Sequence, residues 1–184
     1  MKKFFFLALA AMTAFLNSNA QDNPLQLPIT EDTKKISYTK VNEMPGISKV
    51  DLYKRALTWA GGYYKNVADV LRQQNATEGI IVCKHRFKIT NPPDKKGEVG
   101  TDAGLIEYTL TINFKEEKYR YTMTEFNWKQ KSVFLCEKWL DKTLPGYTPN
   151  YEFYLQQLDE NAKQIIASFE KGMTIGKVEK KDDW

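Results

Sequence analysis

Few side chains in this sequence could carry out chemistry, and the only histidine, His85, is the first to consider. His85 falls in phase with Cys83 and Phe87 in an alternating segment, which directs it toward the apolar side of a strand. A catalytic histidine needs a nearby nucleophile and an orienting carboxylate, and no short motif supplies them. The pattern therefore predicts a core or core-edge histidine that is hydrogen-bonded to a neighbour. A position in a cleft beside an ionised carboxylate would instead favour catalysis.

The other reactive side chains also lack a recognisable site. Cys83 and Cys136 belong to no CxxC or other metal-ligand pattern, and a structural disulfide or two buried free thiols both fit an oxidising compartment. Asp182-Asp183 near the C-terminus is a weak calcium motif at best. Gly61-Gly62 lies within an expected helix and lacks the pattern of a phosphate-binding loop, so it would allow close packing or loosen the helix end. We predict no catalytic residue, no metal site and no cofactor.

The first 20 residues have the three-part order of a cleavable secretory signal peptide. Met1-Lys2-Lys3 provides a positive start, and Phe4–Leu16 is almost entirely apolar. Ser18 and Ala20 are small side chains that fit cleavage between Ala20 and Gln21. The apolar run is shorter than the roughly 20 residues of a membrane-spanning helix, and no cysteine follows it to carry a lipid. We expect an exported protein, periplasmic or extracellular, with no transmembrane segment in the mature chain.

Size and charge narrow the class of protein further. Removing residues 1–20 leaves 164 residues, an ordinary size for one domain with its own core. The formal net charge of the whole chain is +4, and the loss of Lys2 and Lys3 lowers it to +2. So small a charge does not indicate a polyanion partner, and export separates the protein from nucleic acid. We predict a flexible leader over residues 21–29, one domain over 30–172 and a charged tail over 173–184.

Hydrophobic periodicity predicts two helices and several strands. Ser48 with Asp51 three residues later is typical of a helix N-terminus, and Gly172 is placed to end the last helix. The apolar residues of Phe126–Tyr147 have no stable period, so we expect a short strand or turn and an irregular connection there. The expected elements are a strand over Lys35–Met44, a helix over Lys49–Tyr64, an ambiguous segment over Ala68–Gln74, a strand over Ile81–Ile89, a hairpin of Ile106–Phe114 with Tyr119–Met123, and a helix over Tyr151–Lys171.

The expected strands alternate polar and apolar residues, so one sheet face packs on a core and the other meets water. Each helix has one broad apolar face, formed in the first by Leu52, Ala56, Trp59 and Tyr63 and their neighbours. Both helices would therefore cover the same side of the sheet. This predicts the α+β class: a two-layer sandwich in which an antiparallel sheet has two helices on one face.

Several segments of the chain resemble those of one protein family. They are Pro28-Ile29-Thr30, Ile36-Ser37-Tyr38, Pro45-Gly46-Ile47-Ser48 leading into Asp51-Leu52-Tyr53, Ala56-Leu57-Thr58-Trp59-Ala60, Tyr108-Thr109-Leu110 and Tyr119-Arg120-Tyr121. Over roughly residues 28–126 the chain is similar to exported proteins from Bacteroidetes that form a domain-of-unknown-function family with a TATA-binding-protein-like fold. The resemblance implies a β-α-β-β-β-β-α order, which agrees with the periodicity. It implies no catalytic or ligand residues.

The face of the sheet that no helix covers is the strongest candidate for a binding site. Its residues would be Lys84, Arg86, Lys88, Arg120, Thr109 and Thr122, accompanied by Thr111, Thr124 and Glu107. Such a polar, net basic platform suits an anionic glycan, a lipid head group or a partner protein, while an ordinary solvated face is the alternative interpretation. The TATA-binding protein itself inserts apolar wedges into the DNA minor groove, and this face has none, which excludes nucleic acid.

We therefore expect a non-catalytic exported module that binds an unidentified ligand through the open sheet face or the loop over Asn91–Thr101. An envelope or periplasmic hydrolase with an unrecognised site is one alternative. A protein-capturing inhibitor or a chaperone-like module is another.

Overall fold

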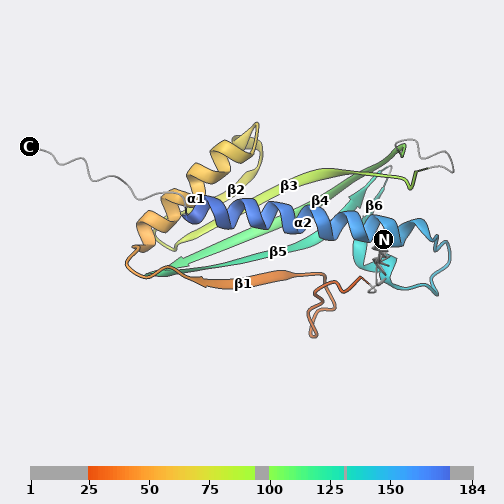
Figure 1. Ribbon diagram of the computed structural model, residues 1–184, viewed down its shortest axis with the longest axis horizontal. Helices are drawn as coiled ribbons and strands as arrows, with labels where there is room; N and C mark the ends of the chain where they lie inside the picture. The colour runs from red at the N-terminus through yellow and green to blue at the C-terminus, as the bar shows by residue number, and fades with distance from the viewer. Residues whose placement is uncertain (1–24, 94–99, 131, 175–184) are drawn as a thin grey trace, which may run out of the picture.

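The computed structural model describes residues 25–93, 100–130 and 132–174 (Figure 1). The expected signal peptide, the start of the leader, the middle of the Asn91–Thr101 loop and most of the charged tail lie outside the described residues. The elements in chain order are β1 (Tyr38–Glu43), α1 (Lys49–Tyr63), a short 3-10 helix η1 (Val67–Asp69), β2 (Leu71–Asn75), β3 (Ile80–Thr90), β4 (Asp102–Lys115), β5 (Lys118–Lys129), β6 (Val133–Leu135), a second 3-10 helix η2 (Cys136–Leu140) and α2 (Asn150–Thr174).

All strands pair antiparallel in one sheet with the order β1-β5-β4-β3-β2. The short strand β6 also pairs with β5, alongside its second half. Helices α1 and α2 contact each other and pack on the same apolar sheet face, with α2 running along most of its length (Figure 1). The predicted α+β sandwich is confirmed, and the sheet has one short strand more than the expected order.

The long hairpin of β4 and β5 forms the centre of the core. Ile106, Leu110 and Ile112 on β4 are at most 1% exposed and alternate with partly exposed polar residues, as the sequence pattern predicts. β5 extends to Lys129, beyond the expected end at Met123. A β-bulge at Glu125 shifts the alternation of buried and exposed residues by one position, so the regular pattern stops before the strand does. The irregular spacing of apolar residues after Met123 therefore marks a bulge within a strand rather than the end of that strand.

The first helix begins as its sequence predicts. The hydroxyl oxygen of Ser48 accepts a hydrogen bond from the Asp51 N–H at 3.1 Å and donates one to the Asp51 carboxylate at 2.8 Å. Gly61 and Gly62 lie near the helix end with no atom within 4 Å of an added Cβ, so close packing does not explain them. Within the described residues neither α1 nor α2 combines the length and hydropathy needed to cross a membrane.

Helix α2 does not end at Gly172, as the sequence suggested, but continues to Thr174. An added Cβ on Gly172 would lie 2.7 Å from Cδ1 of Trp59 on α1, and Met173 in the next position is fully buried. Gly172 is thus a point of close helix contact rather than a C-terminal cap. At the other end of the chain, the Pro28 carbonyl accepts a hydrogen bond from Ser37 N–H at 2.8 Å, which ties that part of the leader to the domain.

Candidate functional site

The residues predicted to form a binding face do lie on the helix-free side of the sheet, but they do not form one cluster. They are Lys84, Arg86, Lys88, Thr109, Arg120 and Thr122. Lys84 on β3 is opposite Thr109 on β4, whereas Arg120 on β5 is opposite Asn113. Four residues along β4 separate these two positions, a distance of roughly 13 Å. Thr122 lies midway between them. The structure therefore leaves Arg120 apart from the three cations of β3.

Glu107 on β4 neutralises part of the expected basic platform. Its carboxylate lies 3.2 Å from Nζ of Lys84 and 3.0 Å from Nζ of Lys129. Burial alone would raise the pKa of Glu107, but the hydrogen bonds and charges of Lys129 and Lys84 hold it below its ordinary value. Within the part of the chain that the structure describes, Arg86 and Lys88 have no ion pair. The free positive charge of β3 is thus concentrated on Arg86 and Lys88.

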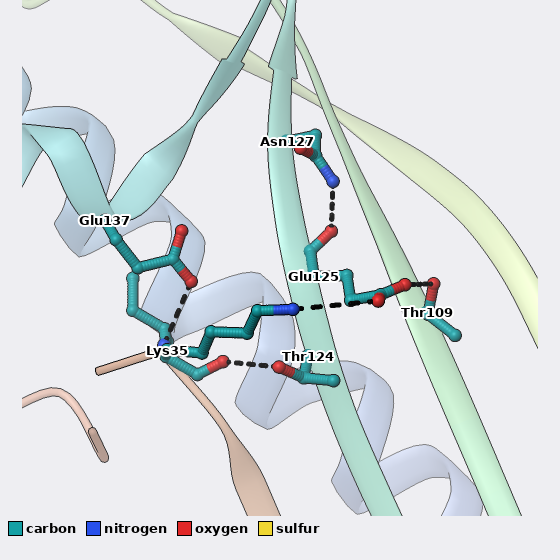
Figure 2. A network of polar contacts seen from close by, with 7 residues as sticks. Lys35, Thr109, Thr124, Glu125, Asn127 and Glu137 are labelled. Carbon is teal, nitrogen blue, oxygen red and sulfur yellow. Dashed lines mark hydrogen bonds and ion pairs between the residues drawn. The ribbon is translucent and has the colours of Figure 1, made fainter. Parts of the chain in front are cut away.

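Thr109 takes part in an internal network of polar contacts at the β5 bulge (Figure 2). Its hydroxyl donates to the Glu125 carboxylate at 2.9 Å, and the other Glu125 oxygen lies 3.8 Å from Nζ of Lys35. On the same flank, Thr124 donates to the Ile36 carbonyl at 2.9 Å, and Glu137 accepts from the Ile36 N–H at 3.0 Å. This network joins the segment before β1 to β5 and η2. It gives Thr109 a structural role.

A cleft of about 690 Å³ lies beside β3, beyond the point where β2 stops pairing with it. It is lined by the end of α1 and the η1 turn, by β3 and β4, and by the middle of α2. The lining side chains are Tyr63, Tyr64, Lys65, Asn66, Asp69, Val70, Arg72, Lys84, His85, Arg86, Phe87, Glu107, Tyr108, Asn161, Gln164 and Ile165. The cleft therefore combines an aromatic wall, amide groups and charged residues of both signs.

His85 lies in this cleft, against aromatic rings. Its ring centroid is 5.0 Å from that of Tyr64 and 6.3 Å from that of Tyr108, and the two tyrosine hydroxyls are hydrogen-bonded at 3.1 Å. Burial, with the neighbouring Arg86 charge, lowers the pKa of His85, and burial raises the pKa of both tyrosines. All three are therefore neutral near pH 7. Catalysis would be favoured by a position in a cleft beside an ionised carboxylate. His85 does lie in a cleft, but among the described residues it has no hydrogen bond to a carboxylate.

The rim of the cleft carries the positive charge. Lys65, Arg72 and Arg86 are all exposed, and none of them has an ion pair within the described ranges. Of the two acids in the lining, Glu107 is paired with lysines, and Asp69 accepts a hydrogen bond from the Asn66 side chain. The cleft can therefore attract an anionic group without first breaking an internal salt bridge.

The cysteines and the potential metal ligands form no second site among the described residues. Cys83 and Cys136 are both buried and free, so of the two alternatives the structure has buried thiols. Burial raises the pKa of Cys83 to about 12 and that of Cys136 well above its ordinary value, which makes both poor nucleophiles. No group of three or more potential metal ligands comes together in the described part of the chain.

The cleft could not be predicted from the sequence because its residues come from separate elements. Helical periodicity predicts Tyr63 on the core face of the first helix, whereas its side chain is 41% exposed. On α2, three uncharged amides occur at steps of four and three residues: Gln157, Asn161 and Gln164. That stripe of amides beside an apolar face was a usable signal, because it follows one side of the helix along the edge of the sheet.

Comparison with known proteins places this geometry in a family. No curated protein matches the chain in sequence. In structure it is similar to a TBP-like protein from Parabacteroides distasonis ATCC 8503, with a TM-score of 0.62 and 13% identity over 77% of this chain and 94% of that one. It is also similar to a DUF4468 family protein from Bacteroides ovatus ATCC 8483, with a TM-score of 0.63 and 14% identity over 82% of this chain and 92% of that one. Identities this low show the fold alone.

The family model described as a domain of unknown function (DUF4468) with TBP-like fold matches residues 38–129, from the first residue of β1 to the last residue of β5. The resemblance predicted from the sequence is thus confirmed, and both structural neighbours come from Bacteroidetes. The match contains α1 and the β3 edge of the cleft, while the amides of α2 lie beyond it. The chain belongs to the DUF4468 family, a domain of unknown function with a TBP-like fold.

Proposed function

We propose that this protein is an exported, non-catalytic binding module that takes an anionic ligand in the cleft beside β3. The observation that carries the proposal is the rim of the cleft, where Lys65, Arg72 and Arg86 are exposed and have no acidic partner among the described residues. Charged side chains held around a concave site with aromatic walls are a usual arrangement for recognition of a small or extended ligand. The open sheet face contributes through Arg86, which lines the cleft, and Lys88 is the next exposed cation along β3 on the same face.

The state of the reactive groups supports a binding role over a hydrolytic one. His85 has a lowered pKa and aromatic neighbours, and the thiols of Cys83 and Cys136 have raised pKa values. A hydrolase would need one activated nucleophile or a general base aligned with its orienting group. The tyrosine pair of Tyr64 and Tyr108 is neutral and serves as a polar element of the wall.

Binding can be tested with an array of anionic and neutral glycans and with vesicles of anionic and zwitterionic lipids, using the chain from Gln21 onward. The double variant Arg72→Ser/Arg86→Ser is expected to weaken binding to the best anionic probe by about tenfold or more. Arg120→Ser is the matched control, because Arg120 is an exposed arginine of the same sheet face that lies away from the cleft. Equal losses in both proteins, or no loss in the double variant, would reject the cleft as the site.

A further inference from the structure

The edge of β3 that borders the cleft is covered only along its first half. β2 pairs with β3 from Ile80 to Cys83, and the Lys84 N–H donates to the Val70 carbonyl at 2.9 Å. Beyond this point the chain turns away into η1, while β3 continues to Thr90 with β4 on its other side. Within the described residues no strand lies against this second half of the β3 edge.

The far end of this open edge is closed by one side chain of α2. The Gln157 amide oxygen accepts a hydrogen bond from the Thr90 N–H at 3.0 Å, and its NH₂ group donates to the Thr90 carbonyl at 2.9 Å. An amide that bonds both backbone groups of one residue reproduces the pairing of a neighbouring strand. The open edge is therefore a defined gap between the Val70 carbonyl and the Gln157 side chain.

Antiparallel geometry fixes which backbone groups the gap presents. The N–H and C=O of one residue point to the same side of a strand, and these groups alternate between the two sides along the chain. The backbone N–H groups of Lys84 and Thr90 donate to Val70 and Gln157 on the side of β3 that faces away from β4. The backbone groups of Arg86 and Lys88 therefore point to that side too. From Lys84 to Thr90 the strand rises by roughly 20 Å, which is room for a segment of about five residues.

We propose that this gap binds an extended acidic polypeptide segment of a partner protein, which adds to the sheet as a strand antiparallel to β3 between Val70 and Gln157. The inference rests on the proposed function and names the ligand class of the same cleft. The added strand pairs with the backbone of Arg86 and Lys88. It lies on the same side of β3 as β2, beyond the point where β2 pairing ends at Leu71. Strand addition of this kind takes its affinity from main-chain hydrogen bonds and its specificity from alternate side chains.

The side chains beside the gap define the sequence that fits it. Arg86 and Lys88 are exposed on the open sheet face, so alternate residues of the added strand meet positive charge there. The residues that alternate with them on β3, His85 and Phe87, face the cleft, where Tyr63 also lies. The segment that fits best therefore alternates carboxylates with apolar side chains.

Charge also decides between a partner protein and a second copy of this chain. Pairing of two β3 edges about a twofold axis would bring Arg86 and Lys88 of one copy against the same residues of the other. Like charges directly opposite on neighbouring strands are destabilising. The same cations attract an acidic segment, which is why the structure favours a different partner over self-association.

The test uses the chain from Gln21 onward and three peptides of about six residues with blocked ends. The first alternates Glu and Val, the second alternates Lys and Val, and the third has the Glu-Val sequence with alternate backbone nitrogens methylated. We expect the first peptide to bind, the Lys peptide not to bind, and N-methylation to weaken binding by about tenfold or more, because methyl groups remove donors and block the strand edge. Amide exchange of Arg86 and Lys88 should slow on addition of the first peptide only.

Protein variants provide the matched comparison. Lys88→Pro removes one N–H from the gap, and proline is tolerated at a strand edge, whereas Lys88→Ser removes the charge and keeps the N–H. We expect Lys88→Pro to bind the Glu-Val peptide about tenfold more weakly than Lys88→Ser does. Equal binding of the methylated and unmethylated peptides would overturn strand addition, as would self-association through β3 in sedimentation measurements.

A further probe separates the two proposals. An oligoglucuronate carries carboxylates but has no peptide backbone. If it binds with dependence on Arg72 and Arg86 while the Glu-Val peptide does not bind, anion binding in the cleft stands and strand addition fails. If neither probe binds, both the proposed function and the strand addition fail.

Discussion

The three long strands β3, β4 and β5 have two outer edges, one on β5 and one on β3, and these two flanks are covered to different extents. On the β5 flank, β1 pairs with the first half and β6 with the second, and the bulge between them is bridged by the polar contacts of Lys35, Glu125 and Glu137 (Figure 2). On the β3 flank, β2 covers only the first half, and the Gln157 side chain covers the last residue. The first flank is closed along its length, and the second contains a gap.

This difference has a physical meaning, because an uncovered strand edge invites pairing with other chains and proteins commonly protect it. Here one flank is sealed with strands and side-chain hydrogen bonds, while the gap in the other is bordered by exposed cations and a cleft. Positive charge at an edge discourages self-association, yet it leaves the backbone accessible to an acidic segment. The comparison therefore predicts that mutations will cost stability on the β5 flank and will affect binding on the β3 flank.

The largest expected contrast comes from two phenylalanines. Phe126 on the closed flank is fully buried and makes an edge-to-face contact with Tyr38 at 5.9 Å, whereas Phe87 on the open flank is only partly buried. Phe126→Ala should lower the free energy of unfolding by about 3–5 kcal/mol, and Phe87→Ala by about 1 kcal/mol. Urea denaturation followed by circular dichroism measures both. Similar losses would mean that the two flanks contribute equally to the core.

A second prediction tests the helix that connects the flanks. α2 bonds to the closed flank through Asp159, which accepts from the Tyr38 hydroxyl at 2.8 Å, and to the open flank through Gln157. Gly172→Ala forces a Cβ against Trp59, so we expect a loss of about 2 kcal/mol of stability. Gly61→Ala is the control: it has open space around it and should stabilise α1 by roughly 0.5–1 kcal/mol. If both glycines tolerate alanine equally, α2 is not held against α1 at Trp59.

The third prediction compares the side chains that bond to backbone groups on the two flanks. Glu137→Ala leaves the N–H of the fully buried Ile36 without its partner and should cost about 1–2 kcal/mol in thermal or urea unfolding. Gln157→Ala frees the backbone of Thr90, which is partly exposed and can bond to water, so the cost should stay below about 1 kcal/mol. A larger loss for Gln157→Ala would contradict the assignment of the β3 edge as the open flank.

Features that depend on a few neighbouring residues could be predicted from the sequence better than features that depend on distant parts of the chain. The alternation in Ile106–Phe114 and the Ser48 cap act over a few residues, so local periodicity and capping rules are sufficient to predict them. The β5 bulge at Glu125 was missed because one extra residue inverts the phase of the pattern after Met123. Gly172 was assigned to a helix end because the sequence does not show that Trp59, far away along the chain, lies against it.

The candidate site could be predicted only in part for the same reason. Arg86 and Lys88 could be predicted on the open sheet face because they share one strand with a regular pattern, whereas the same pattern predicted His85 in the core or at its edge rather than in a site. The gap depends on where β2 stops and on the position of Gln157, and both are tertiary relations between segments that are distant in sequence. The pairing of Lys84 with Glu107, which reduces the expected basic platform, likewise requires the register of β3 and β4.

The smallest expected effect concerns Glu107, whose carboxylate forms ion pairs with Lys84 and Lys129 on the open sheet face. Its folded pKa is below the ordinary value of 4.5, so its contribution to stability is fully present above that pH and is lost as the pH falls through the lower folded value. Glu107→Gln should therefore reduce stability by about 1 kcal/mol or less at pH 7, and the difference from wild type should vanish on acidification.

Binding in this variant should move in the opposite direction. Glu107→Gln frees Lys84, which lines the cleft, so affinity for an acidic probe should rise by a few-fold at pH 7. Glu43→Gln is the control, because Glu43 forms a 4.0 Å ion pair with Lys118, is exposed and lies on β1. We expect Glu43→Gln to change neither the stability nor the affinity for the acidic probe measurably, since exposed ion pairs contribute little. A Glu107→Gln protein that loses stability and gains no affinity would show that Lys84 does not contact the ligand. The binding site would then be limited to the part of the gap beside Arg86 and Lys88.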